Sequence, residues 1–142
     1  MNQRHHILHV DDDLYIRKII HHTLKANFDI TGCIDGVEAM AWLEAGNEPD
    51  IILTDLNMPG MDGKDFISMI RLSAHYRHVP IVVLSGQDDT FTKIDCINMG
   101  ADDFIIKPFN PLEVIAKLNA LLRWVEERRS YMIPPVPHRS ER

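Results

Sequence analysis

Short apolar runs alternate five times with stretches in which apolar side chains recur every three or four residues. The apolar runs, which predict strands, cover residues 7–10, 28–33, 51–54, 81–84 and 104–106. The helical spacing predicts helices over residues 16–24, 37–44, 64–73, 88–99 and 110–129. Strands that alternate with helices in this way predict a parallel sheet with right-handed crossovers and helices on both faces. We therefore expect an α/β doubly wound fold with strand order 2-1-3-4-5.

Capping residues support the predicted helix ends. Asp35 with Glu38 three residues later is a capping-box pattern, and Gly46 and Gly100 are typical residues just beyond a helix. Asn110 is the expected N-cap of the last helix, because a proline follows it at the first helical position. The buried side of that helix is expected to carry Leu112, Ile115, Ala116, Leu122 and Val125.

The length of 142 residues predicts a single domain over residues 1–129. Residues 131–142 contain three prolines and show no periodicity, so residues 130–142 are expected to be a disordered or linker tail. The twenty residues after Leu122 are too few for a DNA-binding or catalytic output domain. The chain is therefore expected to be either a stand-alone domain or one excised from a larger protein.

Composition excludes several classes of protein. A net charge of −6 argues against direct nucleic-acid binding by this domain. The two cysteines and the paired histidines lack the spacing of zinc ligands. No apolar run approaches 18 residues and no signal-peptide pattern is present, so we expect a cytoplasmic protein without a membrane interaction.

Polar side chains stand where four of the predicted strands end. Asp11 and Asp12 follow the first strand, Asp55 the third, Ser85 the fourth and Lys107 the fifth. In doubly wound folds the site lies beyond the carboxyl ends of the strands, so these side chains are expected to face one crevice. Carboxylates that gather there repel one another unless a cation binds between them. Mg²⁺, a nucleophilic carboxylate, a hydroxyl and an ammonium are the components that phosphoryl transfer needs.

Four stretches carry a resemblance to a known family. They are ILHVDDD at residues 7–13, DLNMPGMDG at 55–63, VLSG at 83–86 and GADDFIIKPF at 100–109. Together they resemble the receiver domain of bacterial two-component response regulators, and the resemblance covers residues 7–122. It implies the flavodoxin-like form of the doubly wound fold and a phosphoacceptor that signals rather than a dedicated enzyme, with Mg-dependent self-dephosphorylation.

The resemblance implies roles for the residues at the strand ends. Asp55 would accept a phosphoryl group from a sensor histidine kinase or a histidine phosphotransfer protein. Mg²⁺ would bind Asp12 and Asp55 directly, Asp11 largely through a water, and the backbone carbonyl of Asn57. Asp13 is the weakest ligand candidate and is expected to cap the first helix instead.

The resemblance implies that three further residues take part in phosphoryl binding and output. Ser85 would hydrogen-bond the phosphoryl group and Lys107 would pair with it, with a cis bond before Pro108. Phosphorylation would draw Ser85 inward and let Phe104 turn toward the space left behind. The last two helices and the fifth strand would form the output face. Trp124 either packs on the domain or serves a partner, so a homodimer through the last helices remains open.

One residue departs from the pattern of the receiver family, and three alternative functions have to be considered. His9 stands where receivers usually have an aliphatic residue, and we expect a core histidine with its hydrogen bonds satisfied rather than a pH sensor. An aspartyl-phosphate hydrolase of the haloacid-dehalogenase type would place its nucleophile after the first strand. A flavodoxin would need a phosphate loop there, which Asp11 and its neighbours would repel. A receiver that binds partners without phosphorylation is the last alternative.

Overall fold

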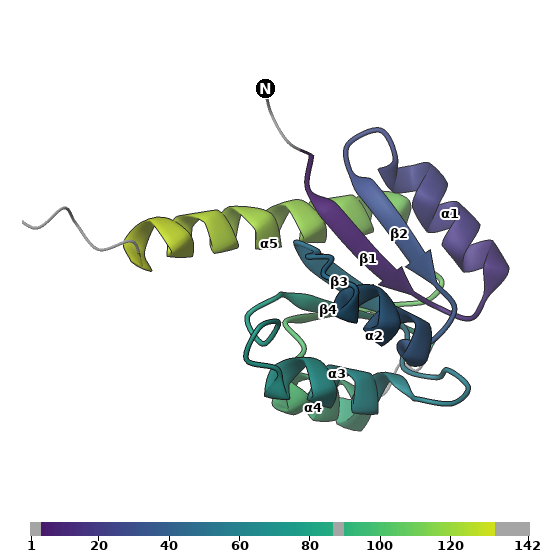
Figure 1. Cartoon of the computed structure of the whole chain (residues 1–142). Helices are drawn as coiled ribbons and strands as arrows, with labels where there is room; N and C mark the ends of the chain where they lie inside the picture. Colours follow the sequence, from purple (N-terminus) through teal and green to yellow (C-terminus); the bar gives the residue numbers. More distant parts are fainter. Residues whose placement is uncertain (1–3, 87–89, 133–142) are drawn as a thin grey trace, which may run out of the picture.

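The computed structural model describes residues 4–86 and 90–132. Five strands and five helices alternate along the chain (Figure 1). The strands are β1 (His6–Val10), β2 (Asp29–Cys33), β3 (Ile51–Thr54), β4 (Ile81–Ser85) and β5 (Asp103–Ile106). The helices are α1 (Leu14–Leu24), α2 (Gly36–Glu44), α3 (Gly63–Leu72), α4 (Thr90–Met99) and α5 (Pro111–Met132).

The strands form one parallel sheet in the order β2-β1-β3-β4-β5, which confirms the predicted topology. Consecutive side chains of a strand point to opposite faces of a sheet, so the apolar runs divide between two cores. One core joins the sheet to α2, α3 and α4, and the other joins it to α1 and α5. Each fully buried Leu or Ile contributes about 1.5–3 kcal/mol to folding, so both helical layers are held mainly by these side chains.

The helix caps follow the sequence closely. Asp13 Oδ1 accepts hydrogen bonds from the N–H groups of Tyr15 and Ile16, so Asp13 caps α1 as expected. Asp35 accepts from the N–H of Glu38 at 2.8 Å, which confirms that half of the capping box. The other half differs, because Glu38 accepts from the N–H of Ile34, one residue before the N-cap.

Two predictions about the last helix need correction. Leu122 is buried as predicted, but Leu112 is 72% exposed and Ala116 is also exposed. The other buried side chains among the described residues of this helix are Val114 and Leu118, eight and four residues before Leu122. The helix also continues to Met132, three residues into the predicted tail. Positions 88 and 89, where the fourth helix was expected to begin, and residues 133–142 of the tail lie outside the described residues.

None of the helices in the described part of the chain has the length and apolar character needed to span a membrane.

One arginine ties α3 to the loops at the amino ends of β4 and β5. The guanidinium of Arg71 donates to the carbonyl oxygens of Gly100, Arg77 and Val79 at 2.7–2.9 Å and to Asp102 at 2.9 Å. Asp102 also accepts from the N–H of Ile81 at 2.8 Å. We call this network the Arg71 clasp. It satisfies carbonyl groups that no helix or strand uses, which makes it a structural centre at the edge opposite the strand carboxyl ends.

Replacing the clasp residue should therefore destabilise the domain. We expect Arg71→Met to lower the free energy of unfolding by about 2–4 kcal/mol, because three carbonyl oxygens and a carboxylate lose their donor together. Urea unfolding followed by circular dichroism measures this. Arg123→Met, on the exposed side of α5, is the matched control and should change stability by less than about 0.5 kcal/mol. Equal stability of the two variants would contradict a structural role for the clasp.

Candidate functional site

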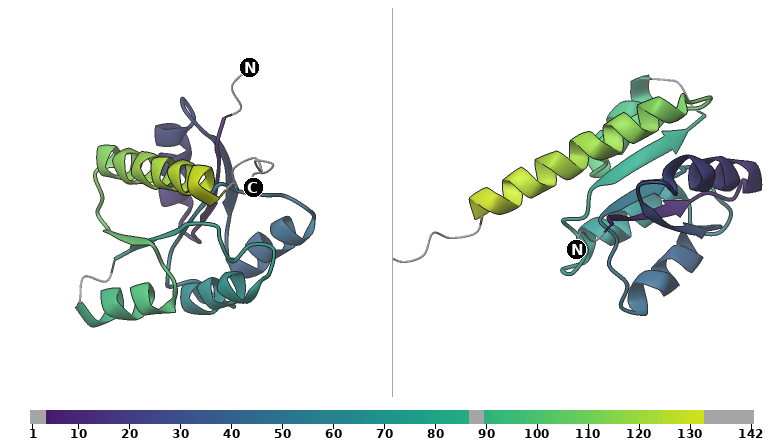
Figure 2. Two further views of the ribbon diagram at one scale, coloured as in Figure 1. Left: turned by 90° about the vertical axis from the view of Figure 1, so that its left-hand side faces the viewer. Right: turned by 90° about the horizontal axis from the view of Figure 1, so that it is seen from above.

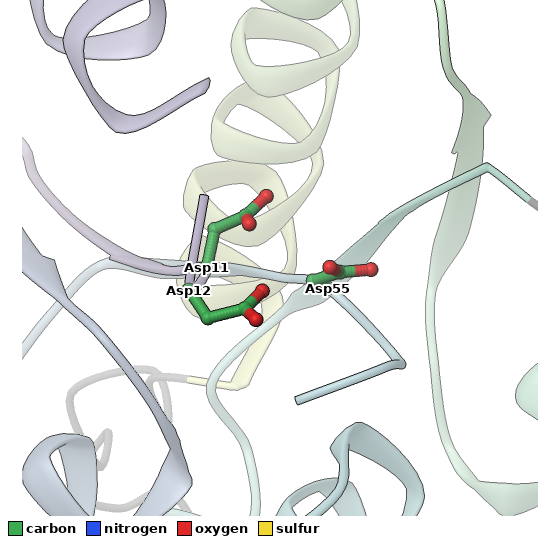
Figure 3. Close-up of side chains that lie close together, drawn as sticks. All are labelled: Asp11, Asp12 and Asp55. Atoms are coloured by element: carbon green, nitrogen blue, oxygen red, sulfur yellow. The ribbon is translucent and has the colours of Figure 1, made fainter. Parts of the chain in front are cut away.

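Three carboxylates meet at the carboxyl ends of β1 and β3. These strands are neighbours, and Val10 lies opposite Thr54. The next residue of each strand is held in line, since the N–H of Asp55 donates to the carbonyl of Val10 at 2.9 Å. Carboxylate oxygens of Asp11, Asp12 and Asp55 consequently all lie within 4.8 Å of one another (Figure 3). The predicted convergence of the acidic residues is therefore present.

Lys107 brings the positive charge to this cluster. Its Nζ lies 3.0 Å from Asp11 Oδ2 and 3.4 Å from Asp55 Oδ2, although the lysine follows β5, two strands away from β3. Its own N–H donates to the carbonyl of Ser85 at 2.8 Å, and the Lys107–Pro108 peptide bond is cis, as expected. The ends of β1, β3 and β5 thus contribute side chains to one polar group, and β4 contributes the backbone carbonyl of Ser85.

Asp55 is held at both carboxylate oxygens. Oδ1 accepts a hydrogen bond from the N–H of Leu56 at 2.7 Å and a longer one from that of Asn57 at 3.5 Å. Oδ2 faces Lys107. The residue is only 7% exposed, so the carboxylate is oriented and partly desolvated while still reachable from one side. This suits a group that forms a bond to an incoming ligand.

Burial and charge act in opposite directions at the ion pair. Asp11 is completely buried, and burial raises the pKa of its carboxyl group, although the N–H of Asp13 and the ammonium of Lys107 both act to lower it. Burial alone would lower the pKa of Lys107, but the hydrogen bond to Asp11 and the attraction of Asp11 and Asp55 raise it overall. One ammonium therefore does not offset the cost of the buried acid.

The donor set fits a magnesium ion. Carboxylate oxygens are the ligands that this hard cation prefers, and it retains several waters when few protein ligands are offered. Asp12 is exposed while Asp11 and Asp55 are buried, so the cluster combines a solvent-facing acid with two fixed ones. Asn57, the fourth predicted ligand, lies beside Asp55, and its ligand role stays a prediction.

The two predicted switch residues occupy neighbouring strands. Ser85 is the last residue of β4 and is fully buried. Phe104, on β5, lies opposite Val83 of β4, which is two residues before Ser85. Phe104 is only 8% exposed. Its ring lies in the core with the ammonium of Lys93 5.9 Å from the ring centroid. The switch between Ser85 and Phe104 stays a prediction.

The expectation for His9 is confirmed in part: the residue lies in the core, but its hydrogen bonds are not all satisfied. This side chain is 1% exposed, and its Nε2 has no hydrogen-bond partner, although Asp11 Oδ2 lies 4.0 Å away. Burial, together with the charges of Lys107 and Arg17, lowers the pKa of His9 to about 3, so the imidazole is neutral. An unpaired polar atom in the core costs stability, and strand periodicity alone gives no sign of it.

Two residues of the site were not identified from the sequence. Arg17 on α1 donates to the backbone carbonyl of Asp11 at 2.7 Å and so holds the loop that carries the acid pair. Gly63, the first residue of α3, lies directly against the backbone of Asp55 and Leu56. A side-chain Cβ there would overlap the Asp55 carbonyl oxygen and come within 2.6 Å of Leu56 Cα. In the sequence, Gly63 could have been identified as the last residue of the DLNMPGMDG stretch at 55–63.

Removing the buried charge of Asp11 should stabilise the domain when no metal is present. At neutral pH in the presence of a chelator, we expect Asp11→Asn to raise the Tm. In a chain near this size, each kcal/mol gained in the free energy of unfolding raises the Tm by about 2–4 °C. A carboxyl group whose pKa is raised by folding supports stability below its unfolded pKa and loses that support as pH rises through the folded pKa. The gain from Asp11→Asn should therefore shrink on acidification.

Scanning calorimetry with and without Mg²⁺ measures this effect. Mg²⁺ should stabilise the wild type more than Asp11→Asn, because the variant offers one carboxylate fewer. Asp13→Asn is the matched control, since Asn also caps helices and Asp13 is engaged with α1. A lower Tm for Asp11→Asn in chelator would count against the electrostatic account.

A side chain at position 63 should disturb the Asp55 loop. We expect Gly63→Ala to lower the free energy of unfolding by about 1–3 kcal/mol, because the overlap is with backbone atoms that can only move together. Backbone NMR shifts should change most at Asp55 and Leu56. Gly86→Ala is the control, since nothing lies within 4 Å of a Cβ at that position. Unchanged shifts at Asp55 in Gly63→Ala would show that a Cβ at position 63 does not displace the Asp55 loop.

Comparisons with known proteins agree with this geometry. The family model of the response regulator receiver domain matches residues 7–119. The probable transcriptional regulator ycf27 of Cyanidium caldarium is 32% identical over 133 residues, which are 93% of this chain and 52% of that protein. The DNA-binding response regulator MtrA of Mycobacterium leprae is 35% identical over 131 residues, 92% of this chain and 56% of MtrA. This chain thus spans about half the length of these curated relatives.

Solved structures show the same fold. The chemotaxis response regulator CheY4 of Vibrio cholerae superposes with a TM-score of 0.78 at 32% identity and covers 83% of this chain and 98% of its own. The receiver domain of Francisella response regulator 1452 gives a TM-score of 0.78 at 32% identity, with coverage of 86% and 99%. Together with the acidic cluster and Lys107, these matches lead to one conclusion: the chain belongs to the response regulator receiver domain family.

Proposed function

We propose that this receiver accepts a phosphoryl group on Asp55 from a sensor histidine kinase or a histidine phosphotransfer protein. The observation that carries the proposal is the placement of the Asp55 carboxylate beside those of Asp11 and Asp12 and 3.4 Å from the ammonium of Lys107, in a residue that is 7% exposed. A carboxylate nucleophile, a cation for the transferred oxygens and a set of metal ligands are the parts that phosphoryl transfer to an aspartate requires.

The proposed transfer is a substitution at phosphorus in which Asp55 is the nucleophile. An oxygen of Asp55 forms a bond to phosphorus while the bond from phosphorus to the donor's imidazole nitrogen breaks. That nitrogen keeps the electron pair, and the product is an acyl phosphate on Asp55. The N–H of Leu56 holds Oδ1 in place at 2.7 Å, and Lys107 and Ser85 would bind phosphoryl oxygens. Mg²⁺ held by Asp11, Asp12, Asp55 and the carbonyl of Asn57 would neutralise charge on the transferred group.

Phosphorylation would alter the balance around Lys107. The ammonium pairs with Asp11 and Asp55 in this structure, and a phosphoryl group would supply a stronger partner on the same side. Because the backbone of Lys107 is bonded to Ser85, a shift of the lysine would reach β4 and β5 together. The output surface on α4, β5 and α5 would follow, with Phe104 already inside the core. Its partner would be an output domain, another protein or a second copy.

The surroundings of Asp11 argue against the hydrolase and flavodoxin alternatives. A hydrolase of the haloacid-dehalogenase type would use a nucleophile after β1, but Asp11 is completely buried and both its oxygens are engaged, with the N–H of Asp13 and with Lys107. The same acids would repel the phosphate of a flavin. We propose instead a signalling domain whose self-dephosphorylation depends on Mg²⁺. A receiver that works without phosphorylation is the alternative that the following experiment separates.

Chemical phosphorylation tests the proposal directly. On incubation with phosphoramidate and Mg²⁺, the intact mass of the wild type should increase by one phosphoryl group, because the donor is small and the nucleophile is pre-oriented. Asp55→Asn should show no increase. Lys107→Met should be labelled at least about tenfold more slowly, since it lacks the cation for the developing charge.

Controls make either outcome informative. Asp35→Asn, which replaces a cap of α2 outside the acidic cluster, should be labelled like the wild type. A receiver known to accept the donor, run in parallel, confirms the reagent. Absence of label on the wild type beside a labelled control receiver would overturn the proposal. Turnover of a phosphomonoester in excess of protein would point to a hydrolase instead.

A further inference from the structure

A second charged site lies near the amino ends of the strands, beside α5. At 22 residues and about 1.5 Å per residue, α5 is roughly 33 Å long, whereas strands of four or five residues span about 15 Å. The second half of the helix therefore projects past the amino ends of the strands (Figure 2). A cavity of about 350 Å³ lies there, lined by Arg71, Arg77, His78, Trp124, Arg128 and adjoining backbone. We call it the basic cleft.

The charge of the basic cleft is opposite to that of the chain as a whole. The chain carries a net charge of −6, yet three arginines and a histidine line this cavity. Its one acidic lining residue, Asp102, is bound to Arg71 at 2.9 Å within the Arg71 clasp. Among the described residues, neither Arg77 nor Arg128 forms an ion pair, and both are exposed. Two guanidinium groups are thus available to bind an anion.

An aromatic ring stands beside these cations. Trp124 is 48% exposed although it is large and apolar, and the guanidinium carbon of Arg128 lies 5.0 Å from its ring centroid. A flat ring that stacks on the half-exposed Trp124 would take the place of this guanidinium over the indole. The displaced Arg128 would then be free to bind phosphate oxygens in a bidentate manner. The cavity volume falls at the small end of the range for ligand sites, which is large enough for one nucleoside phosphate.

We propose that the basic cleft binds a mononucleotide, with its base stacked on Trp124 and its phosphate on Arg77 and Arg128. The proposal goes beyond the phosphoacceptor role and does not depend on it. The cleft draws on α3, the residues before β4, the turn before β5 and α5, whereas the phosphoryl site lies at the carboxyl ends of the strands. A ligand there would fasten the projecting half of α5 to the sheet edge.

The two tryptophans provide a test within the intact chain. Trp42 lies on α2 against the ring of His6 and does not line the cleft, so its indole N–H signal is an internal reference for that of Trp124. AMP is titrated into the labelled protein in chelator, which prevents metal-bridged binding at the acidic cluster. The Trp124 signal should shift saturably while that of Trp42 stays in place. Trp42→Phe assigns the two signals.

Variants and partial ligands decide the outcome. Arg77→Gln and Arg128→Gln should each weaken AMP binding about tenfold, whereas Arg123→Gln, on α5 but outside the cleft, should bind as the wild type does. Adenosine and inorganic phosphate should each bind more weakly than AMP. The proposal fails if AMP does not shift Trp124 at millimolar concentration or if Arg77→Gln has no effect. It also fails if inorganic phosphate binds as well as AMP, or if Trp124 shifts with protein concentration alone, which would indicate a second copy.

Discussion

The charge balance around Lys107 is the constraint on which the rest of the site depends. Three carboxylates have oxygens within 4.8 Å of one another, and a single ammonium pairs with two of them at 3.0 and 3.4 Å. Because Asp11 is fully buried, the pairing leaves it poorly solvated and raises its pKa. The folded domain therefore holds an excess of negative charge at one point. A divalent cation bound between these carboxylates would relieve that excess, so folding and metal binding would be linked through the same groups.

The parallel sheet produces this arrangement without any local motif. Strands β1 and β3 are adjacent, so the residues that follow them meet, and Lys107 reaches across from β5. Backbone hydrogen bonds from Asp55 to Val10 and from Lys107 to Ser85 extend the strand pairing by one residue at each position. Each functional side chain is thereby attached to the most rigid part of the fold. Gly63 then allows α3 to begin directly against the backbone of Asp55, which closes the loop behind this carboxylate.

Sequence reasoning succeeded where the signal was local or followed from topology. The strand order, the caps at Asp13 and Asp35 and the gathering of Asp11, Asp12, Asp55 and Lys107 follow from periodicity, cap chemistry and the meeting of strand ends. It failed where three-dimensional packing decides. Helical spacing placed Leu112 and Ala116 on the buried side of α5, whereas in the structure Val114 and Leu118 pack with Leu122 in the core. The orphan Nε2 of His9 likewise depends on neighbours that lie distant in the chain.

The two edges of the sheet differ in charge, and α5 and β5 connect them. The carboxyl edge gathers acids around one lysine, while the amino edge gathers arginines, one of which forms the Arg71 clasp. Lys107 follows β5 directly, and Asp102 of the clasp precedes it, so one four-residue strand joins the two centres. Buried apolar contacts fix β5 between α4 and α5. The strand β5 is therefore the direct covalent connection between the acidic site and the Arg71 clasp.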